Sequence, residues 1–587
     1  MKGKRTIALM LAGVLGTATL AGCGHEVVGP DGPDSTKTTI IRCTNNDGGF
    51  GTDWLRAAAK RFEEEYANES FAEGKTGVVV EVEGTREARI PSMATDNYNI
   101  YFFENQAEIR DMAQGGNLLP INEVLTEKSD TRDGKAISIE EKIPAERLIA
   151  LKGRDGNYYG LPHFEYVPGL SYDQDLFDAN NFYFADASET QVTPIVTPYG
   201  NANFIANKNA KKHCGNDGVY GTDDDGLPTS LQDMLILCAK MKQMSISPFT
   251  FTGAHKGYAN LLYIAIWGAL AGYEEMQVCY TFDGEIEVVD YDNPAGAFTN
   301  EPLFQGIPNI KKPRTKTITI TEETGYKVYD SAARYYSLAF LQAVQSLNWF
   351  SQDSESTTVS HTDAQANFIF GGKYRNPKIG MIIEGNYWWN ETEEKAKNLS
   401  TYKDKFGDRN IDWMSLPTSV NGPKPVEGTA NELTYVDIGA SFCVVNGNIA
   451  GNTEVINACK KFLQFIYSDA ELQAYTKLTG TNRALIQYPI EDSVYKDMDN
   501  YMQSYQNVVK RADNAKILYS VSDTATFLNS PMTFKLKKSG IPVTTAKIGT
   551  KTFDSLLIAM RDVNASAADI FKSTRMNTND WNAYYTA

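Results

Sequence analysis

The sequence lacks the patterns on which most metal enzymes and hydrolases depend. Its 587 residues include only 5 His, and no HExxH or comparable metal-ligand spacing occurs. It contains no CxxC pair of the kind that binds zinc, no GxSxG nucleophile elbow and no glycine-rich phosphate loop. The sequence therefore shows no place for metal catalysis, for a nucleophilic serine or for a nucleotide.

Positive charge is also scarce. Lys and Arg number 56 against 73 Asp and Glu, which gives a net charge of −17. Such a chain repels phosphate backbones and anionic lipid headgroups, which argues against nucleic acid as a partner and against a peripheral membrane-surface role. The acidity is compatible with a neutral or cationic ligand, and equally with a role in solubility alone.

Long apolar runs are few, and the one at the N-terminus is the most informative. Ile7–Leu20 carries no charge and, at 14 residues, is shorter than a membrane span. Three basic residues precede it, and it ends in the letters LAGC, which resemble a bacterial lipobox. We therefore expect residues 1–22 to be a lipoprotein signal peptide, Cys23 to carry the lipid, and residues 23–37 to form a flexible stalk. The expected location is the extracytoplasmic face of the cell membrane, held only through the lipid anchor.

Six further cysteines lie far apart along the chain. This spacing favours packing as small hydrophobic side chains. A disulfide among them is the alternative, because an extracytoplasmic compartment permits one. They are Cys43, Cys214, Cys238, Cys279, Cys443 and Cys459.

The first folded segment alternates between strand and helix patterns. A β-branched run at 38–44 precedes a helical stripe of apolar residues at 53–66, which Thr52 is placed to cap. Strand patterns follow at 78–82 and 99–103. This order predicts an α/β layer with a parallel sheet, whose ligands lie at the carboxyl ends of the strands, at 45–52 and 104–106.

Several blocks then resemble, in the same order, the family 1 extracellular solute-binding proteins, which are maltose-binding-like receptors of carbohydrate importers. Residues 155–177 (DGNYYGLPHFEYVPGLSYDQDLF) are the most specific match, and 365–389 (QANFIFGGKYRNPKIGMIIEGNYWW) resemble a later block with the family's G-x-W motif. The other matching blocks are 47–66, 99–119, 413–417 and 459–485. One departure is the stretch Gly480 to Arg483, where the family often has G-x-x-P.

The resemblance implies an α/β, two-lobe periplasmic-binding-protein-like fold of type II. Each lobe is expected to hold a mixed sheet flanked by helices, and hinge segments cross between the lobes. We predict lobe one from 38–162 and 432–488, with Val455–Ile466 packed on its sheet. Lobe two is predicted from 163–431 and 489–587, with insertions near 183–227 and 283–327.

The function implied by the resemblance is capture of a carbohydrate, an oligosaccharide, and its delivery to the permease subunits of an ABC importer. The expected receptor is a monomer without enzymatic activity or cofactor. Two alternatives come from other functional classes: a glycan-binding adhesin or sensor module, and a secreted glycan-active enzyme with two carboxyl groups about 5 to 10 Å apart.

Candidate ligand-binding residues come from the strand-end loops of the matching blocks. We expect Tyr387 or Trp388 to stack on the sugar and Trp389 to belong to the core, because adjacent side chains face different ways. Asp47 has an alternative role in a helix-entry turn, and His255 has one in a plain surface loop. The full set is Asp47, Phe50, Phe103, Glu104, Asn105, Glu165, Tyr166, His255, Tyr258, Tyr387, Trp388 and Asp437.

One acidic, glycine-rich loop, 216–226 (NDGVYGTDDDG), raises the question of structural calcium. Asp217, Asp223 and Asp225 supply hard oxygen ligands at short spacing, as Ca²⁺ requires. The glutamate that completes an EF-hand is missing from the residues that follow. A solvated acidic turn is therefore the favoured reading, with calcium as the alternative.

Overall fold

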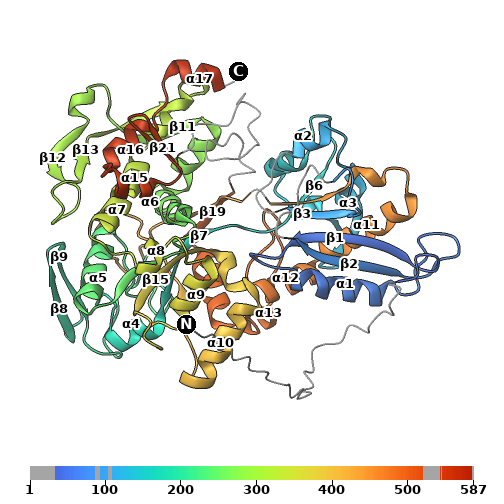
Figure 1. Ribbon diagram of the computed structural model, residues 1–587, viewed down its shortest axis with the longest axis horizontal. Coiled ribbons are helices and arrows are strands. Elements are labelled where there is room, and N and C mark those ends of the chain that lie inside the picture. The colour runs from blue at the N-terminus through green and yellow to red at the C-terminus, as the bar shows by residue number, and fades with distance from the viewer. Residues whose placement is uncertain are drawn as a thin grey trace, which may run out of the picture.

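The structure is a computed structural model that describes residues 33–85, 93–103, 109–439, 441–519, 543 and 545–584. Two bodies built around separate sheets lie side by side (Figure 1). The expected signal peptide at 1–22 and the lipid-attachment residue Cys23 lie outside the described residues. Among the helices that are described, none combines the length and the apolar character needed to cross a bilayer.

The first lobe is built on a five-stranded sheet in the order β2-β1-β3-β18-β6. β1 pairs in parallel with β2 and β3, whereas β18 is antiparallel to β3 and β6. β18 and β6 are neighbours at one side of the sheet although they lie far apart in sequence. The bounds are β1 (Thr39–Asn46), β2 (Val78–Thr85), β3 (Ile100–Phe103), β6 (Gly160–Pro162) and β18 (Phe442–Val445).

Helices cover this sheet because their apolar stripes face it. In α1 (Asp53–Glu65) the residues from Trp54 to Phe62 with helical spacing are buried, as the sequence predicts. Thr52 precedes this helix but, in the described structure, its side chain makes no capping hydrogen bond, so that expectation is wrong. α11 contacts β1, as predicted for Val455–Ile466. The other elements of this lobe are α2 (Ile109–Gln114), α3 (Asn122–Thr126), β4 (Lys128–Arg132), β5 (Lys135–Ser138), η2 (Glu140–Lys142), η3 (Ala145–Leu151), η8 (Gly447–Ile449), α11 (Thr453–Ile466) and α12 (Asp469–Thr479).

The second lobe is built on a four-stranded sheet in the order β10-β15-β7-β16. β10 and β15 are parallel, and β7 runs antiparallel to β15 and to β16. Every residue of β7 and β15 is buried, because helices cover the sheet and the strands form its centre. The bounds are β7 (Pro168–Asp173), β10 (Ser247–Thr250), β15 (Ile379–Gly385) and β16 (Ile411–Trp413).

The long helix α6 (Ala259–Thr281) contacts both β7 and the neighbouring parallel pair of β17 (Leu433–Asp437) and β19 (Ala515–Tyr519). We expected the first lobe to resume at Glu432. β17 instead packs on α6 of the second lobe, so the chain returns to the first lobe only after Asp437. β17 packs on the apolar surface of α6, and this contact between distant segments could not be predicted from the matching sequence blocks.

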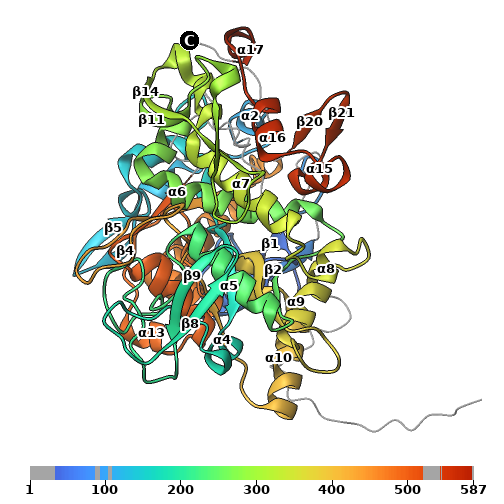
Figure 2. The ribbon, with the colours of Figure 1, turned by 90° about the vertical axis from the view of Figure 1, so that its left-hand side faces the viewer.

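Helices and small hairpins surround the second sheet (Figures 1 and 2). The expected insertions contain the β8–β9 hairpin and the paired strands β11–β14 and β12–β13. The helices are α4 (Gln174–Asn180), α5 (Leu231–Gln243), η4 (Lys256–Tyr258), η5 (Pro294–Gly296), η6 (Glu322–Asp330), α7 (Ala332–Ser346), α8 (Gln352–Glu355), α9 (His361–Ile369), η7 (Asn386–Asn390), α10 (Thr392–Phe406), α13 (Asp492–Lys496), α14 (Asn500–Tyr505), the π-helix η9 (Gln506–Arg511), α15 (Leu556–Asp562), α16 (Ala567–Ser573) and α17 (Thr578–Tyr584). The hairpin strands are β8 (Val192–Thr197), β9 (Gly200–Ile205), β11 (Gly284–Val289), β12 (Phe298–Pro302), β13 (Lys311–Pro313), β14 (Thr315–Ile320), β20 (Ala546–Ile548) and β21 (Lys551–Phe553).

The six described cysteines are all buried, and all are free thiols. The prediction that they pack as small hydrophobic side chains is confirmed, and the alternative of a disulfide among them is not realised.

Candidate functional site between the lobes

Segments that cross between the lobes lie against one another and form the hinge. The first runs from β6 to β7, the second from β17 to β18, and a third leaves α12 toward α13. The His163 N–H donates to the Ser441 carbonyl at 3.0 Å, and the Ile438 N–H donates to the Tyr166 carbonyl at 3.0 Å. The first two crossings are therefore bonded to each other through their backbones.

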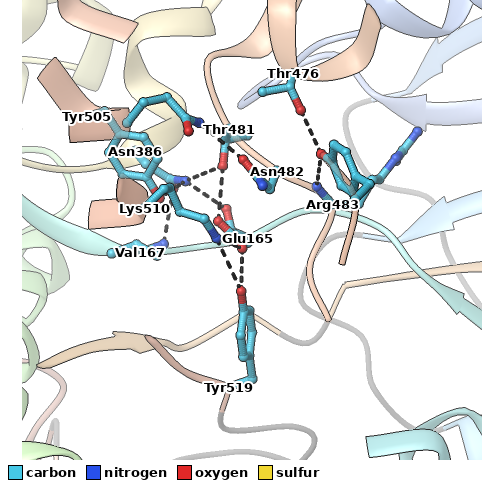
Figure 3. Close-up of polar contacts among 12 residues, drawn as sticks. Glu165, Val167, Asn386, Thr476, Thr481, Asn482, Arg483, Tyr505, Lys510 and Tyr519 are labelled. Atoms are coloured by element: carbon cyan, nitrogen blue, oxygen red, sulfur yellow. Dashed lines mark hydrogen bonds and ion pairs between the residues drawn. The ribbon is translucent and has the colours of Figure 1, made fainter. Parts of the chain in front are cut away.

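Glu165 of the first crossing is the centre of a buried polar network in this hinge (Figure 3). Its Oε1 accepts from Lys510 Nζ at 2.6 Å and from the Tyr519 hydroxyl, and its Oε2 accepts from Thr481 Oγ1 at 3.4 Å. The predicted ligand carboxylate is therefore occupied by side chains from later segments of the chain. Glu165 links segments of the hinge to one another and is not exposed to a ligand.

Asn386 extends the same network toward the second lobe (Figure 3). Its Nδ2 donates to the Glu165 carbonyl at 3.1 Å and to Thr481 Oγ1 at 3.2 Å, while its Oδ1 accepts from the Val167 N–H at 3.1 Å. One amide thus fixes the start of η7 against the first crossing. The residues that follow Asn386 are positioned by the hinge itself.

Three tyrosines gather where the first crossing meets the second lobe, and we call them the tyrosine cluster: Tyr166, Tyr258 and Tyr387. The Tyr387 hydroxyl lies 3.4 Å from that of Tyr166 and 3.5 Å from that of Tyr258. The rings of Tyr166 and Tyr387 pack edge to face with centroids 4.9 Å apart. Three predicted residues from distant parts of the sequence are therefore brought together.

Two carboxyl groups that the sequence analysis missed lie beside this cluster. Gln365 Nε2 donates to Glu384 Oε1 at 3.2 Å and to Glu391 Oε2 at 2.6 Å. Burial, together with the charge of Glu391, holds the pKa of Glu384 well above its ordinary range, and burial also raises the pKa of Glu391. Both Gln365 and Glu384 belong to the matching block at 365–389, and the position of Glu384 directly after the apolar run 379–383 was the available signal.

Glu391 also contacts the first lobe. Its Oε1 accepts from the Gly49 N–H at 3.4 Å, and this contact joins the loop after β1 to the end of η7. In that loop Phe50 is buried and packs edge to face on Phe164 at 4.9 Å. The first predicted binding loop thus meets the second lobe beside the tyrosine cluster.

Asp47 is the exposed member of this loop, and its carboxylate lies over Gly84 of β2. A Cβ placed on Gly84 would stand 1.4 Å from Asp47 Oδ1, so only glycine leaves room for this approach. His255 is exposed at the start of η4, with its ring 6.4 Å from the rings of Tyr258 and His361. His361 is a further polar group near the cluster that the sequence analysis missed.

Trp388 and Trp389 belong to the core of the second lobe. Trp388 is fully buried, and its indole N–H lies within hydrogen-bonding distance of the Tyr501 hydroxyl at 2.8 Å and of Ser171 Oγ at 3.1 Å. Trp389 stacks on Tyr501 at 4.4 Å. The structure therefore corrects the choice of Trp388 as a stacking residue, while Trp389 lies in the core as expected.

Two other predicted positions are also enclosed. Phe103 is buried and stacks on Tyr101 at 5.4 Å, inside the first lobe, and the neighbouring Glu104 and Asn105 lie outside the described residues. Asp437 is buried at the second crossing, where its Oδ1 accepts from the Gly439 N–H at 2.8 Å. The cavity beside it measures about 10 Å³, room for one water molecule and not for a sugar.

The acidic loop of the first insertion folds on itself. Asp217 Oδ1 accepts from the Val219 N–H at 2.8 Å, Asp225 Oδ2 accepts from the Gly221 N–H at 2.7 Å, and Asp223 Oδ2 accepts from Asn507 at 2.8 Å. Across the described part of the chain, no three His, Cys, Asp or Glu side chains gather as metal ligands would. Asp217, Asp223 and Asp225 are therefore not brought together as a calcium site.

Comparisons with known proteins give likeness only at the level of structure. No protein-family model matches the sequence, and no curated protein matches it. The chain is similar to a chitin oligosaccharide binding protein, with 13% identity and a TM-score of 0.47 over 83% of this chain and 90% of that one. A structure from work on xylan utilization by Caldanaerobius polysaccharolyticus has 14% identity and a TM-score of 0.47 over 82% and 91% of the two chains.

A third solved structure, the solute-binding protein RafE in complex with raffinose, has 12% identity and a TM-score of 0.44. It covers 83% of this chain and 90% of that one. The two-lobe α/β fold predicted from the sequence is what the structure has, with a mixed sheet and flanking helices in each lobe.

Proposed function

We propose that this chain is a lipid-anchored, extracytoplasmic receptor that binds an oligosaccharide between its lobes and delivers it to an ABC importer. The observation that carries the proposal is the meeting of the two lobes beside the tyrosine cluster. There Gly49 of the first lobe contacts Glu391 of the second, and three crossing segments form a hinge behind them.

Such an arrangement makes closure depend on the ligand. A molecule held between the lobes gains contacts from both of them only when they are closed, so it shifts the open–closed equilibrium by its differential affinity. A sugar suits this place because its C–H faces pack on aromatic rings and its hydroxyls exchange hydrogen bonds with tyrosine hydroxyls and carboxyl groups. The closed form is then the state that permease subunits distinguish.

The direct test is thermal melting and titration calorimetry of the purified chain with maltotriose, cellotriose, xylotriose, triacetylchitotriose and raffinose. A saccharide present at a hundred times its dissociation constant stabilises the folded state by about 2.7 kcal/mol. Chromatography after long incubation is expected to return that saccharide intact. Stabilisation by none of the five contradicts the proposal, and cleavage of one of them favours the glycan-active enzyme.

The anchor is tested separately by Cys23→Ser. Because the acylated thiol is the only membrane attachment proposed, the variant is expected to leave the membrane fraction or to stay unprocessed. Fractionation of cells followed by immunoblotting measures this. A serine variant that still partitions with membranes as the wild type does would require another attachment.

Delivery to an importer is distinguished from an adhesin or sensor role by the neighbouring genes and by reconstitution. Permease genes encoded beside this chain identify the complex to reconstitute in vesicles. The receptor is then expected to stimulate ATP hydrolysis only when the bound saccharide is present. Equal stimulation with and without saccharide would contradict a role in delivery.

A further inference from the structure

A buried arginine in the hinge has no carboxylate partner within the described part of the chain. Arg483, in the third crossing, is 1% exposed, and no described Asp or Glu lies within ion-pair distance of it. Its guanidinium instead lies over the rings of Tyr475 at 4.0 Å and Trp54 at 4.2 Å. Aromatic faces attract a cation, but they do not replace all the hydrogen bonds that water would supply.

Two hydrogen bonds of the guanidinium go to His163 of the first crossing, whereas Arg483 Nε is buried without a partner among the described residues. Arg483 Nη1 donates to His163 Nδ1 at 2.7 Å and to the His163 carbonyl at 3.2 Å. A guanidinium has no acceptor, so Nδ1 must present its lone pair and the imidazole proton must be on Nε2. Burial and the charge of Arg483 hold the pKa of His163 well below its ordinary range, which keeps this neutral form.

The fixed tautomer determines the next bond. His163 Nε2 lies 3.2 Å from Asn45 Oδ1, and since Nε2 carries the proton it donates to that oxygen. The Asn45 amide is thereby oriented so that Nδ2 donates to the Gly51 carbonyl at 2.6 Å. This last bond closes the loop of residues 46–51, which we call the first-lobe loop.

We infer that His163 is a positioning residue, which links the hinge to the first-lobe loop through Arg483 on one side and Asn45 on the other. The inference rests on the proposed function, because the first-lobe loop is where Gly49 meets Glu391 of the second lobe. Asn45 and His163 are fully buried, so neither reaches a ligand, and both act through the loop. The position of the crossing segments thereby determines the position of the first-lobe loop, which closes on a sugar in the proposed function.

Four single variants and the double variant of His163→Leu with Asn45→Ala test the relay in the full mature chain. His163→Leu removes the bonds of the imidazole to Arg483 and to Asn45, Asn45→Ala removes the bonds of the amide to His163 and to Gly51, and His163→Gln restores one acceptor and one donor. His213→Leu is the matched control, because His213 is also a buried neutral histidine, in the second lobe and away from the hinge. Hydrogen exchange of the amides at 47–51 is measured in the absence of sugar, so its outcome does not depend on the proposed function.

His163→Leu and Asn45→Ala are each expected to speed this exchange about tenfold, and the double variant no more than either alone. His163→Gln is expected to stay near the wild type, and His213→Leu to change the melting temperature without changing exchange in the loop. The affinity for whichever of the five saccharides binds the wild type is expected to fall in His163→Leu and Asn45→Ala and to stay near the wild-type value in His163→Gln and His213→Leu.

Unchanged loop exchange in folded Asn45→Ala or His163→Leu would overturn the inference. So would effects that simply add in the double variant. Absence of saccharide binding by the wild type contradicts the proposed function alone, because the exchange measurement still decides whether the relay exists.

Discussion

Tyr387 and Trp388 are neighbours in η7, yet one faces the lobe boundary and the other the core. In a 3₁₀-helix successive side chains are separated by about 120°, so two adjacent aromatics cannot share a surface. The Trp388 indole N–H lies against Tyr501 and Ser171 beneath the sheet, whereas the Tyr387 hydroxyl meets Tyr166 and Tyr258. The sequence motif identifies the turn but not which ring is turned inward.

This difference gives opposite expectations for two substitutions. Trp388→Ala is expected to lower the free energy of unfolding by about 3 to 5 kcal/mol and to leave the saccharide affinity of the folded fraction intact. Tyr387→Phe keeps the ring and removes the hydroxyl, so affinity is expected to fall about tenfold with a smaller change in stability. Denaturant unfolding and calorimetry measure the two quantities. The reverse pattern would place Trp388 at the ligand.

At the scale of elements, α6 shows how one residue shapes a helix. The helix runs from Ala259 to Thr281 and passes through a kink at Gly272. Gly272 has φ 76° and ψ 169°, a conformation that residues with a Cβ almost never adopt. The kink lets the second half of α6 turn toward β11 and η6.

Gly272→Ala is expected to destabilise the protein by about 1 to 3 kcal/mol, because the alanine must hold that backbone conformation. A Cβ there meets Glu432 Oε1 only at 3.4 Å, so the cost comes from the backbone and not from a clash. Gly257→Ala, at a position without positive φ and with open space around its Cβ, is the matched control. Denaturant midpoints compare the two, and equal midpoints would contradict the strained kink.

Beyond the kink, Glu275 gives a pH dependence. Its carboxyl group accepts from Ser331 Oγ at 3.0 Å and from the Glu287 N–H at 3.1 Å, and burial raises its pKa to about 7. The unfolded chain ionises near pH 4.5 while the folded one keeps the proton, so stability falls as pH rises from about 4.5 to 7.

Ionisation of Glu275 lowers the free energy of unfolding by roughly 3 kcal/mol over this pH range. Glu275→Gln is expected to remove that part of the pH dependence. The measurement is unfolding free energy at pH 5, 6, 7 and 8 for both proteins. Asp412, whose pKa burial also raises to about 7, contributes in the same direction and remains in the variant as an internal reference. Parallel curves for the two proteins would show that Glu275 ionises normally.

The elements show which features local pattern can predict. Runs at 38–44, 53–66, 78–82 and 99–103 became β1, α1, β2 and β3, because alternation and helical spacing are local properties. The second sheet joins strands near residues 170, 248, 382 and 412, and such pairings depend on packing between distant segments. The same applies to the site. Tyr166, Tyr258 and Tyr387 were predicted singly, whereas the pairing of Glu384 with Glu391 through Gln365 depends on the folded structure.

At the scale of the whole molecule, the two lobes are joined by crossings whose side chains bond to one another. Glu165, Asn386 and Thr481 come from the first crossing, the second lobe and the third crossing, and Lys510 comes from η9 (Figure 3). The sequence placed Glu165 at a ligand because it stands at the first crossing. Its enclosure depends on Lys510 and Tyr519, more than 340 residues later in the chain.

Glu165→Gln therefore separates a hinge role from a ligand role. Removing one partner of a buried ion pair leaves the other charge uncompensated, and Lys510, whose side chain is 16% exposed, would lose its carboxylate. The expected cost is about 3 kcal/mol of unfolding free energy.

The companion variants are Lys510→Met and the double variant, in which no unpaired charge remains, so the double variant is expected to recover part of that loss. Denaturant unfolding gives the three stabilities, and calorimetry with the binding saccharide gives the three affinities. A folded Glu165→Gln protein with wild-type stability and lost saccharide affinity would return Glu165 to the ligand, because only a carboxylate that touches the sugar produces that combination.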